Sequence, residues 1–340
     1  MSQDWNDFLS QQGASSDGEH FGSPAGELEA ARTGTVFAPL PDFGLIRAGG
    51  EEAAAFLHNL LTNDVKSLAP DAVRFAGLCT AKGRLIASFN IWHDHNDDLL
   101  LMLSADILPG ILKKLSMYVL RSKVKLNDAS GERVLIGMAG PEAEAQVEAL
   151  GAAIPFPMQV VPFDNGQIVR LDERRFVLAV DPAAAASVWI RLEVKNRAVG
   201  TAAWRWLEIA AGQPRIVAGT QEAFVPQMAN FEVPAVAGVS FTKGCYPGQE
   251  IVARAQYLGK VKRRMYRARI DAAAAPGTHV YASETGDQHC GGIVTVAPAP
   301  EGKHECLVVV QSSCAEAGDV HLGSLSGPRL DLLALPYSVG

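Results

Sequence analysis

Residues 73–93 read VRFAGLCTAKGRLIASFNIWH and decide the fold of the first half of the chain. Two apolar runs, Val73–Cys79 and Arg84–His93, flank the segment Thr80-Ala81-Lys82-Gly83. Short apolar runs that are separated by a few turn-forming residues including glycine are typical of a β-hairpin. The stretch therefore predicts two antiparallel strands joined at Thr80–Gly83.

Helical patterns lie on both sides of this hairpin. The stretch 51–61 places its apolar residues on one helical face, and 106–120 has the same period with Pro109 in its first turn. Further strands are predicted beside them at Leu45–Ala48, Leu99–Leu103 and Lys123–Leu126. Helices that alternate with paired strands indicate an antiparallel α+β arrangement.

A second unit of the same kind follows. Its predicted elements are a strand, a helix, two strands and a helix, at Val134–Ala139, Pro141–Leu150, Ile168–Leu171, Phe176–Val180 and Pro182–Val194. This β-α-β-β-α succession is ferredoxin-like in order and is interpreted as a second copy of the first unit. A further helix is predicted at Trp204–Ala211.

The texture changes after Leu258, where short strands alternate with Gly-, Pro- and charge-containing turns up to Ala334. This spacing predicts a small C-terminal β-barrel. The expected organisation is a partly mobile leader at 1–33, an α+β region at 34–257 with subdomains at about 34–130 and 131–257, and a barrel at 258–340.

Composition limits the classes of function. The chain has 340 residues, 48% of them apolar, a formal net charge of −7 and a pI of about 5.6, so bulk attraction to nucleic acid is not expected. Five scattered cysteines without a zinc-like spacing indicate a reducing compartment. The N-terminus does not resemble a signal peptide and no apolar stretch is long enough to span a bilayer, so we expect a cytoplasmic protein that does not associate with a membrane. We also expect a monomer.

The segment 243–254, KGCYPGQEIVAR, carries the strongest chemical signal. It combines a thiol, a phenol, an amide, a carboxylate and two cations. Gly248 permits a tight bend or a close backbone approach, and a short helix is predicted to begin after it. Cys245 would then lie just ahead of a helix N-terminus, where Lys243 and Arg254 favour a thiolate.

Other patterns have simpler explanations. His93–Asp98 contains two histidines and three aspartates, but Asn and Asp are selected by turns, so a hairpin tip without a metal is favoured. Six cations in 260–269 would suit phosphates, yet a solvated barrel strand is favoured, and direct RNA contact stays open. Trp204 and Trp206 are interpreted first as core residues. No phosphate loop, dinucleotide fingerprint or nucleophile elbow occurs.

The segment KGCYPGQE resembles the signature of the YgfZ-type folate-binding proteins, which are relatives of the glycine-cleavage T-protein, an aminomethyltransferase. Similar landmarks are 61–65 (LTNDV), 81–84 (AKGR), 121–124 (RSKV), 224–227 (FVPQ) and 335–337 (LPY). The resemblance implies two α+β domains, at least one ferredoxin-like, and a C-terminal barrel around a channel that holds a tetrahydrofolate. It also implies a role in iron–sulfur cluster assembly or maintenance, and thereby in tRNA modification, with client enzymes of unknown identity.

The resemblance also assigns residues. The folate-contacting aromatic positions fall on Phe43 and Trp204, which moves Trp204 towards a stacking role. Further cofactor-binding residues are expected at Asn63, Tyr246, Gln249, Glu250 and Arg254. Cys245 and Lys243 are the expected reactive pair.

One departure from the transferases bears on the reaction. The transferases carry an aspartate pair after a Gly-Gly hairpin, but here that hairpin has Ala87 and Ser88, neither of which supplies a carboxylate. Ordinary glycine cleavage is therefore not expected. A folate-dependent one-carbon transferase acting on another substrate, and a non-catalytic adaptor with folate as a structural ligand, remain alternatives.

Overall fold

The computed structural model describes residues 3–257 and 261–339. Leu258, where the barrel was predicted to begin, and Lys260 of the cationic stretch lie outside these ranges. The chain divides into two compact units that each use separate stretches of sequence. One contains 1–54, 67–74 and 90–204, and the other contains 55–66, 75–89 and 205–340. The boundaries of these two units therefore differ from those of the consecutive domains predicted above, because each unit combines segments that are separated in the sequence.

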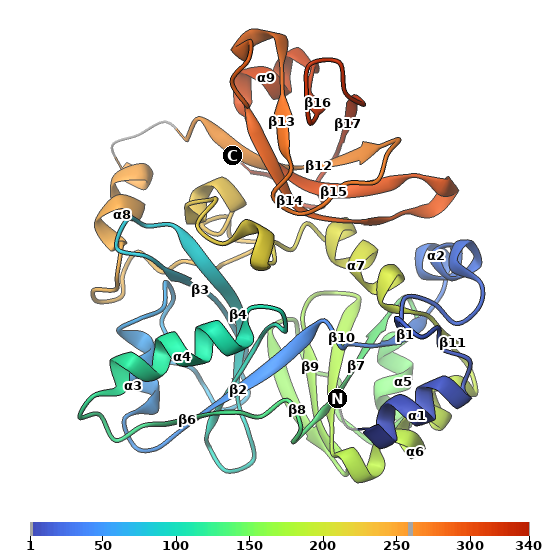
Figure 1. Cartoon of the computed structure of the whole chain (residues 1–340). Helices are drawn as coiled ribbons and strands as arrows, with labels where there is room; N and C mark the ends of the chain where they lie inside the picture. Colours follow the sequence, from blue (N-terminus) through green and yellow to red (C-terminus); the bar gives the residue numbers. More distant parts are fainter. Residues whose placement is uncertain (1–2, 258–260, 340) are drawn as a thin grey trace. The chain divides into compact units, whose positions relative to one another are not determined.

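The first unit contains a six-stranded sheet in the order β11-β1-β7-β10-β9-β8 (Figure 1). Its strands are β1 (Val36–Pro39), β7 (Val134–Ala139), β8 (Gln159–Phe163), β9 (Gly166–Arg170), β10 (Arg175–Val180) and β11 (Arg197–Ala198). The helices between them are α5 (Ala143–Ala149) and α6 (Ala185–Glu193). Apart from β1 and β8, the order β11-β7-β10-β9 is that of a ferredoxin-like sheet, which confirms the α+β prediction.

The core of this sheet includes residues from the N-terminal segment. Helices α1 (Gln3–Gln11) and α2 (Pro24–Thr33) occupy the region expected to be a leader. Trp5 and Leu9 are 4% and 5% exposed, and the Trp5 ring meets Trp189 edge-on at 5.6 Å between centroids. The short amphipathic piece around Trp5 is therefore part of the core, because its apolar face packs on α6.

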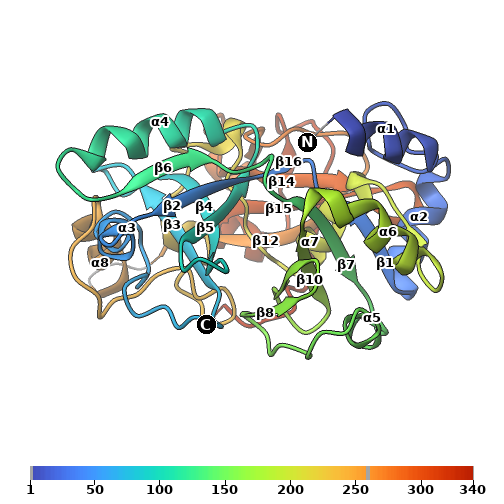
Figure 2. The same ribbon diagram turned by 90° about the horizontal axis from the view of Figure 1, so that it is seen from below.

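A second, five-stranded sheet has the order β3-β4-β5-β2-β6. Its strands are β2 (Phe43–Gly49), β3 (Arg74–Cys79), β4 (Leu85–His93), β5 (Leu99–Ser104) and β6 (Lys125–Asp128). With helices α3 (Ala53–His58) and α4 (Leu108–Val119), the order β4-β5-β2-β6 repeats the ferredoxin-like arrangement. Figure 2 shows α4 lying alongside β6. The two α+β sheets share this strand order, which supports the interpretation of the second β-α-β-β-α succession as a copy of the first.

The C-terminal region of the second unit forms a curled half-barrel sheet, in the order β16-β13-β14-β15-β12-β17. Its strands are β12 (Arg263–Ile270), β13 (His279–Tyr281), β14 (Gly291–Pro298), β15 (His304–Gln311), β16 (His321–Leu322) and β17 (Leu330–Leu333), with α9 (Ser312–Ala317) after β15. Two further helices, α7 (Thr201–Ala210) and α8 (Gln249–Tyr257), precede it.

Over the described ranges, no helix combines the length and the apolar character that crossing a bilayer requires.

Candidate functional site: the Cys245 loop

The Cys245 loop, residues 243–248, is positioned by contact between two glycines. Gly248 has φ +82°, and a Cβ there would lie 2.5 Å from the Thr80 carbonyl oxygen and 2.7 Å from Gly83 Cα. Gly83 itself has φ +68°, and its Cβ would meet Ile251 at 3.0 Å. Both positions therefore exclude a side chain, so the loop lies directly on the turn of the β3–β4 hairpin. The predicted helix follows as α8.

Lys243 is buried beneath the loop with 9% exposure. Its ammonium group donates hydrogen bonds to the backbone carbonyl oxygens of His58 and Leu61, the latter at 2.6 Å, and lies 4.9 Å from the centroid of the Tyr246 ring. Burial lowers the pKa of Lys243 from 10.5 to about 8, partly opposed by the charges of Asp64 and Cys245. The cation is thus held by neutral acceptors next to the thiol.

Cys245 differs from the other four cysteines in its accessibility. It is exposed, whereas Cys79, Cys290, Cys306 and Cys314 are buried. Burial raises the pKa of Cys79 to about 12, so its thiol stays protonated at neutral pH. Cys245 is therefore the cysteine of this chain that a solute can reach.

The sequence analysis missed a histidine and an aspartate beside this loop. His58, the last residue of α3, has its Nδ1 2.9 Å from Oδ1 of Asp64. A Cβ built on Gly244 would lie 3.9 Å from His58 Nε2, so the ring is close to the residue that precedes Cys245. A histidine at a helix end, six residues before an aspartate in the LTNDV landmark, was the signal available in the sequence.

The remaining residues that the resemblance assigned to this region are differently engaged. Tyr246 is 6% exposed, and burial raises its phenol pKa. Gln249 is half-buried at the start of α8, and Glu250 and Arg254 are exposed on that helix. Asn63 is 5% exposed and donates its amide group to the carbonyl oxygens of Phe75 (2.8 Å) and Ala237 (2.6 Å). Asn63 therefore stabilises the turn through its side chain.

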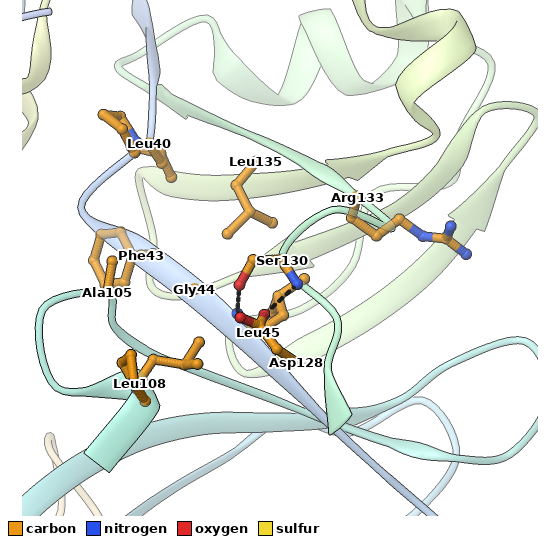
Figure 3. Close-up of a pocket in the computed structure, with 12 residues that line it drawn as sticks. Leu40, Phe43, Gly44, Leu45, Ala105, Leu108, Asp128, Ser130, Arg133 and Leu135 are labelled. Atoms are coloured by element: carbon orange, nitrogen blue, oxygen red, sulfur yellow. Dashed lines mark hydrogen bonds between the residues drawn. The ribbon is translucent and has the colours of Figure 1, made fainter. Parts of the chain in front are cut away.

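Phe43 lies in the first unit, where it lines a cavity of about 140 Å³ (Figure 3). Leu40, Leu108 and Leu135 form apolar walls of the cavity. Its polar lining residues are Asp128, Ser130 and Arg133, and the Ser130 hydroxyl accepts the Leu45 amide at 3.1 Å. A cavity of this size is below the roughly 300 Å³ of drug-sized ligand sites, so it suits one ring rather than a whole folate.

Trp204 is 2% exposed in the same unit. Three atoms of its six-membered ring would lie 2.5–2.8 Å from a Cβ on Gly137, so the indole packs flat against the bare backbone of β7. Its Nε1 is buried and has no hydrogen-bond partner within residues 3–257 and 261–339. Leaving a buried N–H without an acceptor costs about 1–3 kcal/mol of folding free energy, so the unpaired Nε1 of Trp204 requires an explanation.

Ala87 and Ser88 both have structural roles in β4. Ala87 is fully buried, and the Ser88 hydroxyl, 4% exposed, accepts the Ile216 amide at 3.0 Å. The hairpin residues that stand where the transferases have carboxylates are therefore used within the fold.

The two charged stretches are accounted for by local pairing. Asp94 accepts the amides of Asn96 and Asp98 in the β4–β5 turn and pairs with Arg47. Within the described part of the chain, no three His, Cys, Asp or Glu side chains are grouped as a metal site.

In β12, three of the six cations of 260–269 meet carboxylates. Arg264 pairs with Glu232, while Arg267 pairs with Glu305 through a 2.8 Å hydrogen bond and Arg269 reaches the same carboxylate at 3.7 Å. This pairing agrees with the interpretation of the stretch as an ordinary barrel strand.

Comparisons with known proteins place this chain among proteins built on the aminomethyltransferase scaffold. The model of the GCVT N-terminal domain matches residues 15–178. The glycine cleavage system aminomethyltransferase T from Bartonella henselae superposes with a TM-score of 0.70, over 93% of this chain and 89% of that one, at 16% identity. At this identity the superposition shows the fold.

Sequence relatives define the family within that class. The tRNA-modifying protein YgfZ of Sodalis glossinidius is 30% identical over 307 residues, which cover 88% of this chain and 92% of the relative. That of Photobacterium profundum is 32% identical over 306 residues, covering 88% and 91%. The chain belongs to the YgfZ family.

Proposed function

We propose that this protein binds a tetrahydrofolate, or a one-carbon-substituted form of it, and acts in iron–sulfur cluster assembly or maintenance and thereby in tRNA modification, with Cys245 as its reactive group. The observation that carries the proposal is the contrast among the cysteines. Cys245 is exposed beside the buried Lys243 cation, while the other four are buried.

The chemistry of the loop supports this role. A thiolate is both a nucleophile and a soft ligand for iron. Lys243 supplies a positive charge that stabilises a thiolate at Cys245, and its bonds to two carbonyl oxygens fix the start of the loop. The protein would thus present one accessible thiol in a defined place, either as a nucleophile or as a transient ligand for sulfur or iron.

The residues of the first unit fit a folate ring. Phe43 offers a flat apolar wall in a cavity that also has the polar groups of Asp128 and Ser130 in its lining, whereas the Arg133 guanidinium points away and pairs with Asp181 at 2.8 Å (Figure 3). The unpaired Nε1 of Trp204 is a buried donor that a ligand acceptor would satisfy. A bound reduced folate would supply a one-carbon carrier, and these residues would bind and orient it.

Complementation tests the role of the thiol. Cys245→Ala should abolish rescue of an iron–sulfur phenotype in cells that lack the native protein, whereas folate binding by the purified variant stays within about twofold because Cys245 is not among the residues that line the cavity around Phe43. Full rescue by Cys245→Ala at equal protein level excludes the thiol mechanism and favours the adaptor reading.

Equilibrium binding of reduced folates tests the pocket. Phe43→Ala should weaken binding at least about tenfold by removing a stacking surface, and Trp204→Ala should do so by removing the indole and its buried N–H donor. Trp204→Phe keeps an aromatic ring and removes only the N–H, so it separates stacking from hydrogen bonding. Unchanged affinity in all three folded variants would place the folate elsewhere.

The second candidate is a folate-dependent one-carbon transferase that acts on a substrate other than glycine. It is favoured by the shared scaffold and opposed by the structural use of Ala87 and Ser88. Turnover of methylene-tetrahydrofolate by the purified protein, lost in Cys245→Ala, would decide for it.

A further inference from the structure

We infer that His58 is the general base that takes the proton from the Cys245 thiol, and that Asp64 positions the His58 ring. The inference rests on the proposed function in one respect, the choice of Cys245 as the reactive group. It adds two residues that neither the loop motif nor the sequence analysis assigned.

The first step of the argument is the tautomer of His58. Its Nδ1 lies 2.9 Å from Asp64 Oδ1, and a carboxylate accepts a proton but has none to give at neutral pH. We therefore assign the hydrogen to Nδ1, which donates it to Asp64 at a shorter distance than the 3.5 Å that separates Nδ1 from the Lys66 amide nitrogen, while Nε2 keeps its lone pair. The two side chains are 15% and 32% exposed, so the pair is partly shielded from solvent.

The second step is where Nε2 lies. A Cβ built on Gly244 would lie 3.9 Å from His58 Nε2. The basic edge of the imidazole ring therefore faces the residue that precedes Cys245. Because residue 244 is glycine, no side chain fills the space between the ring and the loop. The same helix end is fixed to the loop from below, since the Lys243 ammonium donates to the His58 carbonyl oxygen.

The third step is the charge around the pair. Beside the pair, Lys243 donates to the His58 carbonyl oxygen and Lys66 brings its backbone amide to Nδ1, while Tyr246 lies next to Lys243 and is influenced by Cys79. Tyr246 and Cys79 have raised pKa values and stay neutral at pH 7. Asp64 then stabilises a positive imidazole against the nearby Lys243 cation, and the same cation stabilises a negative sulfur.

The proton transfer follows directly. The S–H bond of Cys245 breaks, a new N–H bond forms at His58 Nε2, and the electron pair stays on sulfur. With an alkylating probe such as iodoacetamide, the sulfur forms a bond to carbon as the carbon–iodine bond breaks and iodide leaves. This is the nucleophile–base–orienter arrangement in which His58 is the base and Asp64 is a positioning residue.

The pH dependence of alkylation tests the pair in the full-length protein. The rate of iodoacetamide addition to Cys245 is measured from pH 5.5 to 9.5 by mass spectrometry of the peptide that contains it. Cys245→Ser gives the background from the four buried thiols. At pH 7, His58→Gln should react about tenfold more slowly than wild type, and the two rates should converge above pH 9, where hydroxide removes the proton without the histidine.

Two further variants keep the test specific. Asp64→Asn, which keeps the shape but disturbs the tautomer, should give a smaller loss at pH 7, of about threefold. His95→Gln alters an exposed histidine in the β4–β5 turn and should follow the wild-type profile. Unchanged thermal midpoints and circular dichroism would show that the variants are folded.

The inference is overturned if His58→Gln and Asp64→Asn both give the wild-type profile. It is also overturned if Cys245 of the folded wild type is alkylated no faster at pH 7 than a cysteine in an unstructured peptide, a result that stands even if His58→Gln does not fold. These outcomes are distinct from failure of the proposed function, which complementation by Cys245→Ala would reveal.

Discussion

Two cations in this protein, the half-buried Arg47 and the buried Lys243, are held in opposite ways. Arg47 in β2 pairs with Asp94, with Asp98 at 3.3 Å and with Glu132 at 2.6 Å, so its charge is matched by carboxylates and its pKa is raised despite burial. Lys243 bonds to backbone carbonyl oxygens, and burial lowers its pKa to about 8.

The different partners of Arg47 and Lys243 distinguish a cation that stabilises the fold from a cation that can act on a neighbouring reactive group. The charge of Arg47 is fully used to join the turn after β4 to β2 and to Glu132. The charge of Lys243 is only partly compensated, so it stays available to the neighbouring thiol. A cation that is buried among neutral acceptors beside an accessible nucleophile therefore points to function, whereas one among carboxylates points to the fold.

Removing Arg47 should have the largest effect on stability. Arg47→Met leaves Asp94, whose side chain is 1% exposed, without its partner, and should lower the free energy of unfolding by about 3 kcal/mol. Urea denaturation measures this loss. Alkylation of Cys245 should be unchanged in the folded variant, and a change there would break the distinction between the two cations.

Removing Lys243 should cost less stability but more reactivity. Lys243→Met leaves two carbonyl oxygens without their donor but also removes a buried charge, so we expect a loss of about 1–2 kcal/mol. The rate of Cys245 alkylation at pH 7 should fall about tenfold because the thiolate loses its cation. A variant that reacts as fast as wild type would contradict the role given to Lys243.

The same variant has a signature in pH. Lys243 has a folded pKa of about 8 and an ordinary value of 10.5, so between these limits the unfolded chain binds more protons than the folded chain. Stability from this group therefore rises with pH over that window. The difference in unfolding free energy between wild type and Lys243→Met should grow from pH 8 towards 10.5, and a constant difference would refute the lowered pKa.

The contact between Lys243 and Tyr246 should contribute least. The ammonium nitrogen lies 4.9 Å from the ring centroid, and a cation–π contact at a partly buried site is worth about 0.5–1 kcal/mol. A double-mutant cycle with Lys243→Met and Tyr246→Leu should return a coupling energy in this range. A coupling near zero would leave the two carbonyl oxygens as the chief partners of Lys243.

Local signals predicted those parts of the fold that depend on neighbouring residues. The hairpin around Thr80–Gly83, the helix after Gly248 and the ferredoxin-like succession all follow from periodicity and turn residues. Strands β1, β8 and β11 were missed. Strands β1 and β8 are short and contain a proline, Pro39 and Pro162, which argues against a strand in a single sequence, and β11 has only two residues.

The candidate site was predicted only in part, for a related reason. Cys245 and Lys243 share one motif and could be recognised together. His58 and Asp64 come from a helix end and a turn far earlier in the chain. The hydrogen bonds of Lys243 to the carbonyl oxygens of His58 and Leu61, and the docking of Gly248 on Gly83, join that region to the loop. Such long-range contacts have no periodic signal.

The docking of Gly248 on Gly83 also has a consequence for folding kinetics. It closes a very long loop of chain, and contacts of high sequence separation tend to form late. During synthesis, the helix end that carries His58 is made long before the segment that carries the thiol. Under the activation by His58 proposed above, a nascent or partly unfolded chain would hold an unactivated cysteine, and the onset of fast alkylation at Cys245 would report that folding is complete.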